Sequence, residues 1–518
     1  MKMKKYITII LCATFVLTGC GDFLEPSSKS EFVPDDAVSL NELLLGEAYM
    51  RNDMDGFNEF INLLDDDIEA APYQKPIAGF DGNKYLAAFS WQPDMYRMME
   101  EAGAGIINQY ECFYEVILGA NAVIDYLPEV SDTEDNMNKV KAQAHALRAF
   151  YYFNLVNLYG PPYNYLPDSL GVPLKLNSGI EESNEYLKRK TVKEVYQQIL
   201  LDLHIAEEAY NALPIDLQWD KNFRASLPMV RLLLSRTYLY MENWEKAAEY
   251  AEYVMKDNRF ALLDLNTVPL YNGSIRNYAV YSSYSSSETI WPYGSIKDMF
   301  QWTHDYANQT TETGRMHAYF KASQSLLDCF DGADLRKSRY IIQAPDNKGS
   351  GKLMYMAYGK VNYDTGTFLP QNVVGQFGRC LRLSEAYLNY AEAKAMLGGA
   401  NSADAIAALN ELTVKRFDPE DYEPYEYTTD EELISFVREE RRRELCFEGH
   451  RWFDLRRWGM PAISHTWYDD DKNISTYHLE ERDSLYTLPI PDEALELNAS
   501  LIQNDLPEKR IPETVTVQ

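Results

Sequence analysis

The residues able to do chemistry are densest between positions 441 and 459, which read "RRRELCFEGHRWFDLRRWG". Six arginines share these nineteen residues with Glu444, Glu448, Asp454 and His450, in a chain of formal net charge −30. A group of this kind could bind an acidic partner, support catalysis, or hold a fold together by ion pairs. The spacing of the charges and the rest of the chain have to decide between these roles.

The spacing favours the structural role. Opposite charges stand three or four positions apart, which makes them neighbours on a helix; the predicted pairs are Glu439 with Arg443, Arg441 with Glu444, and Glu448 with Arg451. Apolar and aromatic residues interleave with the arginines and offer faces on which guanidinium groups can stack. We predict a helix that turns at Gly449 and packs against the body of the protein, with His450 as a satisfied, partly buried histidine.

No other pattern indicates catalysis. The sequence has no H-E-x-x-H, G-x-S-x-G or G-x-G-x-x-G motif, and "GSGK" at 349–352 lacks the glycine spacing and the hydroxyl of a phosphate-binding loop. Two acidic runs, "LLDDDIE" at 63–69 and "WYDDDKN" at 467–473, could bind calcium, which takes oxygen ligands, but neither has EF-hand spacing. We predict solvated or helix-capping carboxylates there, no catalytic residue and no cofactor, with a structural calcium ion as the alternative.

The charge balance argues against nucleic acid as a partner. The chain has 49 basic and 79 acidic residues, whereas a duplex-binding surface needs uncompensated cations to neutralise phosphates. Its 46% hydrophobic and 25% charged residues are typical of a folded protein, and 518 residues can bury a large core. The 39 tyrosines and 8 tryptophans suit wet binding surfaces for sugars or peptides without demonstrating either.

The N-terminus has the pattern of a lipoprotein signal. A basic "MKMKK" precedes an apolar run at 6–17, which is shorter than the roughly 20 residues needed to span a bilayer. The run ends in "LTGC", which predicts cleavage before Cys20 and lipid attachment to that cysteine. The alternative is an ordinary secretory signal with a chance Gly-Cys pair. We predict a signal peptide over 1–19, a lipidated tether over 20–38, and four free thiols: Cys112, Cys329, Cys380 and Cys446.

The remaining residues, 39–518, read as one mainly α domain. Helical periodicity recurs along the chain, and the predicted helical stretches are 140–159, 191–213, 226–256, 382–397, 404–416 and 431–447. Two segments, about 65–109 and 257–378, are irregular and rich in polar and aromatic residues. We interpret them as long insertions with little β structure, the kind of segment in which binding functions concentrate.

A dispersed repeat suggests how the helices pack. "LLLSRTYLY" at 232–240 aligns with "LRLSEAYLN" at 381–389, and "ALRAFYYF" at 146–153 is a weaker third copy. Each of the first two copies precedes a helix with closely spaced small residues, such as Ala247, Ala248 and Ala251 after Trp244. This arrangement predicts tetratricopeptide-like helix pairs that are separated by insertions.

Several motifs carry a resemblance to a known family. The segment at 441–459 closely resembles the C-terminal signature of the SusD/RagB family, and further similar pieces follow in the family's order: "LTGCGDFLEP", "AHALRAFYYFNLVNLYGPP", "SETIWPYG", "CFDGADLRKSRY" and "LYTLPIPDEALELNASLIQN". The chain departs from the family at Asn504-Asp505-Leu506, where the family usually continues Asn-Pro-Gly-Tyr. The likeness spans essentially the whole chain.

The resemblance implies a function as well as a fold. Members are non-catalytic lipoproteins of the outer membrane that capture glycans at the cell surface and pass them to a SusC-like TonB-dependent transporter. The alternatives are the same scaffold binding peptides, or a structural tetratricopeptide adaptor. By position, the implied ligand-binding aromatics are Trp91, Tyr96, Trp302 and Tyr306, with Tyr281, Tyr284 and Tyr293 behind them. A core or covering role is at least as well supported for any one of these rings.

Overall fold

Helices are the main elements of the computed structural model, which describes residues 33–50, 60–72, 82–104, 108–179, 187–270, 280–281, 286–295, 320–345, 353–356, 377–469 and 473–516. The longer helices are α5 (Gln109–Tyr126), α6 (Glu134–Tyr159), α7 (Val192–Asn211), α8 (Leu227–Tyr240), α9 (Trp244–Met255), α13 (Leu383–Leu397), α14 (Ser402–Thr413) and α15 (Asp430–Leu445). The shorter ones are α2 (Ala37–Leu43), α3 (Leu86–Phe89), α4 (Met95–Glu101), α11 (Gln324–Leu327), α12 (Arg336–Arg339), α16 (Arg451–Arg457) and α17 (Asp492–Leu497). The mainly α fold class predicted from the sequence is confirmed.

Local sequence explains where the long helices begin. Thr191 caps α7 in a capping box with Glu194, and Thr133 and Thr429 accept hydrogen bonds from the first turns of α6 and α15. A capping oxygen satisfies one of the backbone N–H groups that a helix start leaves without an internal partner. All six predicted helical stretches contain helices, and the stretch 226–256 contains two, α8 and α9.

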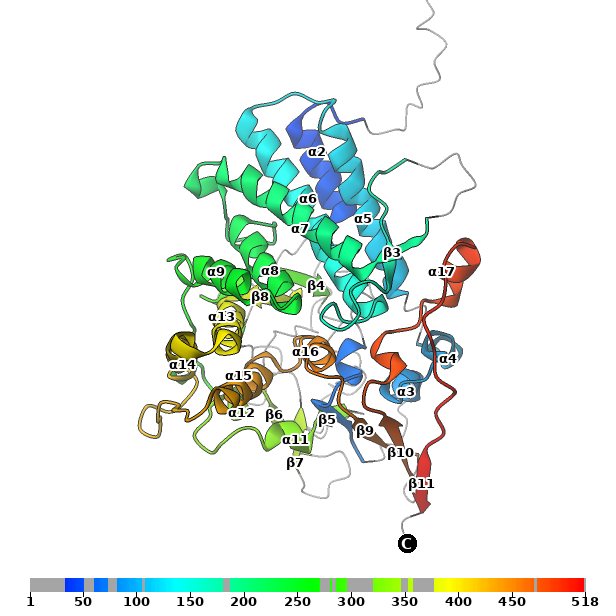
Figure 1. Cartoon of the computed structure of the whole chain (residues 1–518), viewed down its shortest axis with the longest axis vertical. Coiled ribbons are helices and arrows are strands. Elements are labelled where there is room, and N and C mark those ends of the chain that lie inside the picture. The colour runs from blue at the N-terminus through cyan, green and yellow to red at the C-terminus, as the bar shows by residue number, and fades with distance from the viewer. Residues whose placement is uncertain are drawn as a thin grey trace, which may run out of the picture.

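Successive helices pack against one another along the chain (Figure 1). The series runs from α5 through α6, α7, α8 and α9 to α13, which contacts both α14 and α15. Residues 142–159 of α6 are all buried, and this helix contacts α2, α5, α7, α8 and the strand β2 (Leu170–Pro173). The hydrophobic core therefore extends along the series of packed helices, and α6 contributes residues from all around its circumference.

The predicted repeat corresponds to real helix pairs. Ser235 on α8 donates from Oγ to the carbonyl oxygen of Ala247 on α9 at 2.9 Å, and the small residues of α9 are buried. The second copy begins just before α13, which packs against α14, although its matching serine, Ser384, bonds to Glu288 instead of to the second helix. The closer comparison with tetratricopeptide repeats stays a prediction.

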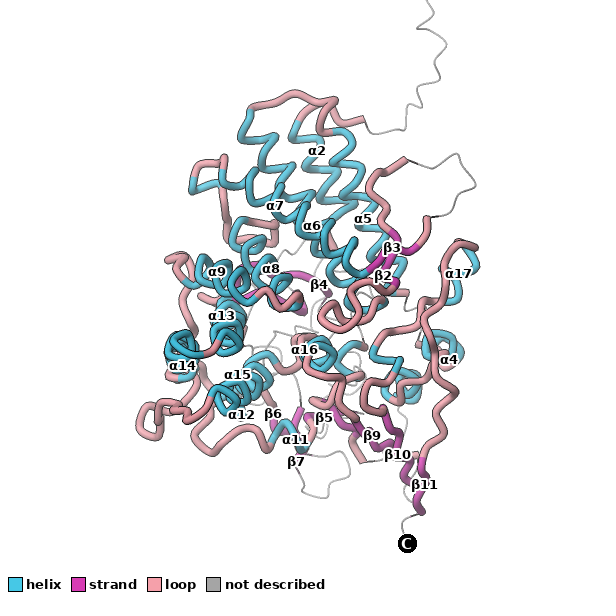
Figure 2. Tube along the Cα trace, viewed as in Figure 1, coloured by secondary structure: helices cyan, strands magenta, loops and turns pink. Residues whose placement is uncertain are grey.

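The strands form small antiparallel sheets, most of them in the lower half of Figure 2. The pairs are β1 (Ile68–Ala70) with β5 (Phe320–Ala322), β2 (Leu170–Pro173) with β3 (Arg189–Thr191), β4 (Thr289–Ser295) with β8 (Phe377–Arg382), and β6 (Ile342–Pro345) with β7 (Leu353–Met356). A three-stranded sheet has the order β11 (Glu513–Thr516), β10 (Asn473–Leu479), β9 (Ile463–Tyr468). β9 alternates buried and outer residues, so it covers the core with one face only.

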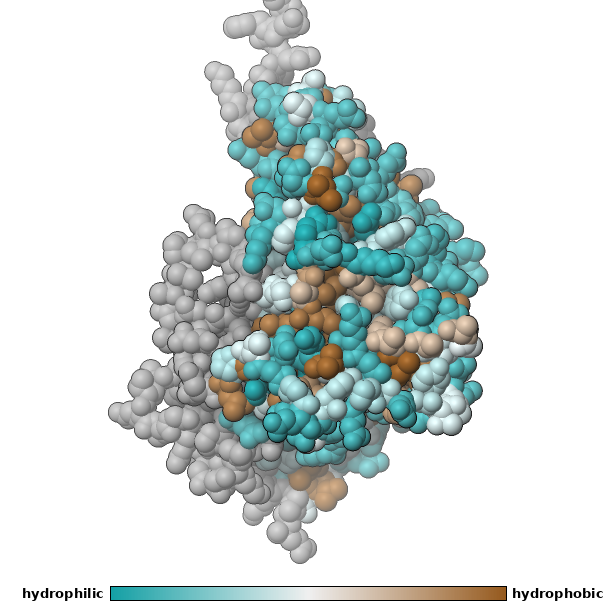
Figure 3. All heavy atoms as spheres, turned by 90° about the vertical axis from the view of Figure 1, so that its left-hand side faces the viewer, coloured by the Kyte–Doolittle hydropathy of each residue, from teal (hydrophilic) through white to brown (hydrophobic). Residues whose placement is uncertain are grey.

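The predicted membrane anchor can be compared with the N-terminal region and the surface of the structure. Helix α2 begins at Ala37, while Cys20 and the predicted signal peptide lie outside the described residues. Within the described part of the chain, the structure has no helix that is both long and apolar enough to cross a bilayer. The face shown in Figure 3 is mostly hydrophilic, in keeping with the 79 acidic residues of the chain.

Candidate functional site

A polar cavity lies beside β4, between the connection from α7 to α8 and the connection that follows α9. Its volume is about 190 Å³. The lining combines apolar, hydroxyl, amide and cationic side chains: Trp219, Lys221, Asn222, Arg259, Phe260, Ser286, Ser287, Thr289, Ile290 and Pro292. Segments far apart in the sequence therefore meet at one small concave site.

Hydrogen bonds tie the three walls of this cavity together. The indole N–H of Trp219 donates to the carbonyl oxygen of Ile290 at 3.2 Å, and that of Trp291 donates to Phe223 at 2.8 Å. The backbone N–H of Ala261 donates to the carbonyl oxygen of Ser287 at 3.0 Å. Because each wall is bonded to β4 or to the segment just before it, the cavity is a built part of the fold.

One wall of the cavity is aromatic and bears a cation. The Trp219 and Phe260 rings pack edge to face at 5.2 Å, and the guanidinium of Arg259 lies 5.8 Å from the Trp219 ring centre. Asp257 holds that guanidinium by two hydrogen bonds, at 2.8 and 2.6 Å. The lining also includes the exposed Lys221.

The chemistry of the lining suits binding better than catalysis. Hydroxyl and amide groups can donate to and accept from a small polar molecule, and the aromatic wall can cover an apolar face of it. The ten described lining residues include no histidine, cysteine, aspartate or glutamate, the side chains that most often act as general bases.

A group of buried charges lies behind the cavity and fixes β4. This buried charge network consists of Glu288, Asp334, Arg336, Arg382, Arg416, Glu440 and Glu444, all of them buried. Glu444 is at its centre and accepts hydrogen bonds from Arg336 (3.1 Å), Arg382 (2.6 Å) and Arg416 (2.9 Å). Although burial opposes ionisation, the three guanidinium groups hold the pKa of Glu444 well below its usual value.

Glu288 links this network to the cavity wall. It accepts hydrogen bonds from Arg416 at 2.7 Å and from the backbone N–H of Leu263 at 2.8 Å. Its neighbours Ser287 and Thr289 line the cavity. The network therefore positions both β4 and the connection after α9, and its role is structural.

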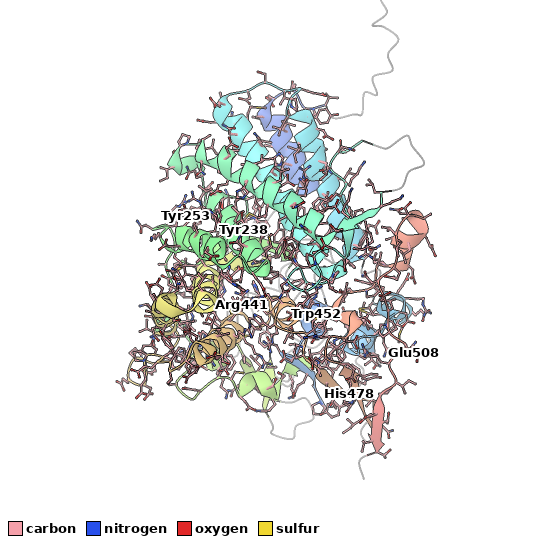
Figure 4. The ribbon with its side chains drawn as sticks, viewed as in Figure 1. Tyr238, Tyr253, Arg441, Trp452, His478 and Glu508 are labelled. Atoms are coloured by element: carbon pink, nitrogen blue, oxygen red, sulfur yellow. The ribbon has the colours of Figure 1, made fainter. Side chains whose placement is uncertain are left out.

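The segment at 441–459 is scaffold, as predicted, but two of its three predicted ion pairs are wrong. Arg443 does meet Glu439, at 3.5 Å. Arg441, labelled in Figure 4, instead pairs with Asp454 at 2.8 Å, and Glu444 is bonded by three arginines of the buried charge network. The turn at Gly449, with φ +78°, brings α16 back and supplies that aspartate.

The third predicted pair is replaced by two longer-range ones. Glu448 accepts from Arg382 at 2.8 Å, and Arg451 pairs with Asp66 at 2.6 Å. Sequence spacing detects only partners within one helix, whereas these residues find partners across the fold. The predicted stacking does occur at the end of the segment, where Arg457 lies 4.6 Å from the ring centre of Trp458.

The acidic run at 63–69 is also not solvated, contrary to the prediction. Asp65 and Asp67 are buried, Asp67 pairs with Arg442 at 2.8 Å, and Asp66 accepts from Arg451. Asp470 and Asp471 of the second run lie outside the described residues. Within the described ranges, no three histidine, cysteine or acidic side chains are grouped so as to hold a metal ion. The four cysteines predicted to be free form no disulfides.

His450 gives a test of this buried region through pH. Its Nδ1 lies 3.4 Å from Nη2 of Arg441, and burial together with Arg236 and Arg441 holds its pKa well below 6.5. As the pH falls below 6.5 the unfolded chain takes up a proton at this site before the folded one does. We therefore expect His450 to cost the folded state about 1.4 kcal/mol per pH unit in that range.

Unfolding by denaturant at a series of pH values from 7 to 5 measures this effect. The variant His450→Gln should show a shallower loss of unfolding free energy with acidification than the wild type, because one titrating group is gone. Parallel curves for the two proteins would contradict a neutral, buried His450.

The aromatic residues predicted to bind ligand have packing roles where the structure describes them. Trp91 is 0% exposed, stacks on His465 at 4.1 Å, and donates from Nε1 to the carbonyl oxygen of Leu64 at 3.0 Å. Tyr293 is buried and stacks on Trp291. Each of these rings therefore has one face covered by another aromatic ring, and neither is exposed to solvent.

Two further predicted tyrosines are hydrogen-bonded to other tyrosines. The hydroxyl of Tyr281 lies 2.7 Å from that of Tyr340 beside the buried charge network, and the hydroxyl of Tyr96 lies 2.9 Å from that of Tyr159. The other predicted residues, Tyr284, Trp302 and Tyr306, lie outside the described residues. Ligand contact by these seven residues stays a prediction, and burial counts against Trp91, Tyr281 and Tyr293.

Sequence reasoning missed the residues of the cavity. Arg259, Phe260 and 286–292 do fall within the predicted insertion 257–378, so the region was indicated correctly. Trp219 offered a signal of its own, since "LQWDKNF" places a lone tryptophan among polar residues between two helices. Nothing in the sequence shows that this segment meets residue 259.

Comparison with known proteins places the chain in a family. A model of the SusD family matches residues 378–507, and a model described as "starch-binding associating with outer membrane" matches residues 23–239. The chain belongs to the SusD/RagB family. Both matches include helices of the packed series, and the first contains the signature at 441–459.

SusD relatives cover most of the chain. SusD-like protein P2 of Formosa agariphila is 26% identical over 427 residues, which is 76% of this chain and 78% of that protein. A SusD superfamily structure from Bacteroides thetaiotaomicron gives a TM-score of 0.68 at 22% identity and covers 91% of this chain and 100% of its own. A laminarin-binding SusD-like protein gives a TM-score of 0.62 at 20% identity, and the match covers 91% of this chain and 99% of that protein. These likenesses to solved structures establish the SusD fold.

Proposed function

We propose that this protein binds oligosaccharides at the outer membrane without cleaving them and delivers them to a SusC-like TonB-dependent transporter. The observation that carries the proposal is the cavity beside β4, in a chain of the SusD/RagB family. It joins an aromatic wall to hydroxyl, amide and cationic groups within one small concave site.

This lining matches the two faces of a sugar ring. The C–H face of a pyranose is apolar and can lie on Trp219 or Phe260, while its hydroxyls can bond to Asn222, Ser286 and Ser287. Among the residues that the structure describes, none of those lining the cavity is acidic, which favours binding over glycoside hydrolysis, a reaction that uses a pair of carboxyl groups. The starch-binding description of one matched family model and the laminarin-binding neighbour support a glycan as the ligand.

The proposal places the protein on the membrane through lipid on Cys20. The "LTGC" ending of the apolar run and the outer-membrane description of the family model that matches 23–239 support this anchor. A multiply acylated cysteine would hold firmly, at about 0.8 kcal/mol per buried methylene. The protein would cover the transporter barrel as a lid, and bound sugar would enter the cell through that barrel.

Native gel electrophoresis through polysaccharides tests the proposal. The purified protein is expected to be retarded in a gel that contains one particular glycan from a panel including starch and laminarin. The variants Trp302→Ala and Tyr306→Ala test the predicted aromatic residues, with Tyr165→Ala, an exposed tyrosine outside both the cavity and the predicted site, as the matched control.

The possible outcomes separate the alternatives. Retardation by a glycan that remains intact after prolonged incubation would support capture without cleavage. Release of shorter sugars would contradict the non-catalytic role. Failure of every glycan to retard the protein, alongside retention of peptides, would overturn the proposal in favour of peptide uptake.

A further inference from the structure

We infer that the cavity beside β4 selects one acidic sugar residue, a ring bearing a carboxylate or a sulfate ester, at the end or on a branch of a glycan. This inference rests on the proposed glycan-binding function and narrows its ligand class. It is carried by the charges of the lining and by the size of the cavity.

The ionisable groups of the lining are both cationic. They are Lys221 and Arg259, in a chain whose formal net charge is −30. The adjacent carboxylates already have partners, because Asp257 accepts from Arg259 and Asp220 accepts from the Asn222 side chain at 2.8 Å. Lys221 is exposed at the rim and forms no ion pair with any residue in the described part of the chain. The described lining therefore offers two cationic groups and no carboxylate, while Asp220 and Asp257 directly beside it balance their charge.

The two cations can act on the same ligand group. Asp257 binds Nε and Nη2 of Arg259, which leaves Nη1 as the donor for a ligand, and the Trp219 ring below the guanidinium restricts its position. Lys221 lines the same small cavity, and its long side chain can reach a ligand bound there. Hydrogen bonds between ionised partners are stronger than those between neutral groups, so an anionic substituent gains most from this pair.

The polar wall is arranged for recognition of one ring. The Asn222 side chain is held from both ends, since its Oδ1 accepts from the backbone N–H of Arg224 at 2.7 Å. A volume of about 190 Å³ lies below the usual range of drug-sized pockets. The cavity is small, which suits a single terminal or branching sugar residue as the group that enters it.

Titration of the full-length protein with three simple sugars tests the inference. The probes are galacturonic acid, galactose 6-sulfate and galactose, with binding followed by saturation-transfer NMR and calorimetry at low salt. At least one acidic sugar is expected to bind roughly tenfold more tightly than galactose, the effect of one charge-assisted hydrogen bond. The acidic probe with the higher affinity shows whether the cavity prefers a carboxylate or a sulfate ester.

Charge variants connect the preference with the cavity. Lys221→Gln should bring the affinity for the acidic sugar to within about threefold of that for galactose, a difference that neutral hydrogen bonds can account for. Lys193→Gln is the matched control and should leave the preference for the acidic sugar unchanged. It removes an exposed lysine near the start of α7, and the cavity lies beyond the other end of that helix. Equal affinities for acidic and neutral sugars, or an acid preference that survives Lys221→Gln, would overturn the inference.

The same samples distinguish failure of the inference from failure of the proposed function. If a neutral polysaccharide retards the protein in gels while the acidic sugars show no preference, glycan binding stands and the acidic specificity is wrong. If no polysaccharide retards it and none of the three sugars binds, both are wrong.

Discussion

Replacement of Glu444 by glutamine is expected to lower the free energy of unfolding by about 3–5 kcal/mol, the usual cost of removing one partner from a buried ion pair. Glu444 accepts hydrogen bonds from Arg336, Arg382 and Arg416, and all four side chains are buried. Glutamine has nearly the same shape but no charge. It would leave the three guanidinium groups with less compensating charge in a region that water cannot reach.

Denaturant unfolding at pH 7, followed by tryptophan fluorescence, measures this effect. The pKa of Glu444 lies well below its usual value, so its stabilisation is fully present at pH 7 and is lost only as the pH falls through the folded-state pKa. Glu439→Gln on the same helix is the matched control. The Glu439 side chain is 58% exposed and lies 3.5 Å from Arg443, so its loss should cost no more than about 1 kcal/mol. Equal costs for the two variants would contradict a central role for Glu444.

The buried charge network explains how an insertion can be held on a helical frame. It joins Arg382 at the end of β8, Arg416 after α14 and Glu444 on α15 to Glu288 beside β4. Ion pairs are directional and lose much of their strength when misplaced, whereas apolar contacts tolerate sliding. The network therefore fixes the register of β4, and with it the wall of the cavity.

The helical frame was predictable because its signals are local. Periodicity and caps such as Thr191 with Glu194 lie within one turn of each other, so they can be read without knowing the fold. The turn at Gly449 was predictable for the same reason, since the left-handed φ there favours glycine. An added Cβ at this position would also collide with the guanidinium of Arg379.

The partners of the charged residues were not predictable by these means. Arg451 meets Asp66, which is 385 positions away in the sequence, and local spacing instead offered Glu448. The acidic run around Asp66 looked like a solvated loop because the sequence does not reveal that two arginines of another segment reach it. Long-range ion pairs depend on topology, which a single sequence does not supply.

Aromatic residues posed a different problem at the candidate site. A tryptophan that stacks on a sugar and one that packs in the core have the same side chain, and both occur in irregular segments. Trp91 and Trp219 illustrate this ambiguity. Trp91 was one of the seven predicted ligand residues and is fully buried, while Trp219 was not singled out and lines the cavity.

Trp91→Ala is expected to lower the free energy of unfolding by about 3–5 kcal/mol, as for other large-to-small changes in a core. The indole stacks on His465, and its N–H bonds to the Leu64 carbonyl at 3.0 Å. Trp91 also has φ +50°, which is unfavourable for a bulky residue, so surrounding contacts must hold it in place. Arg510 contributes one of them, donating from Nε to the Trp91 carbonyl at 2.9 Å.

Trp91→Phe separates a structural role from ligand contact. Phenylalanine keeps a ring for His465 but loses the indole hydrogen bond and some volume, so it should cost less than alanine, about 1–2 kcal/mol. Because the folded protein would persist, Trp91→Phe should be retarded by the same glycan as the wild type in native gels. Loss of retardation in a Trp91→Phe protein that still unfolds cooperatively would show that the ring reaches the ligand, and that the segment around it opens when sugar binds. Unchanged retardation together with the two stability losses would assign Trp91 to the core.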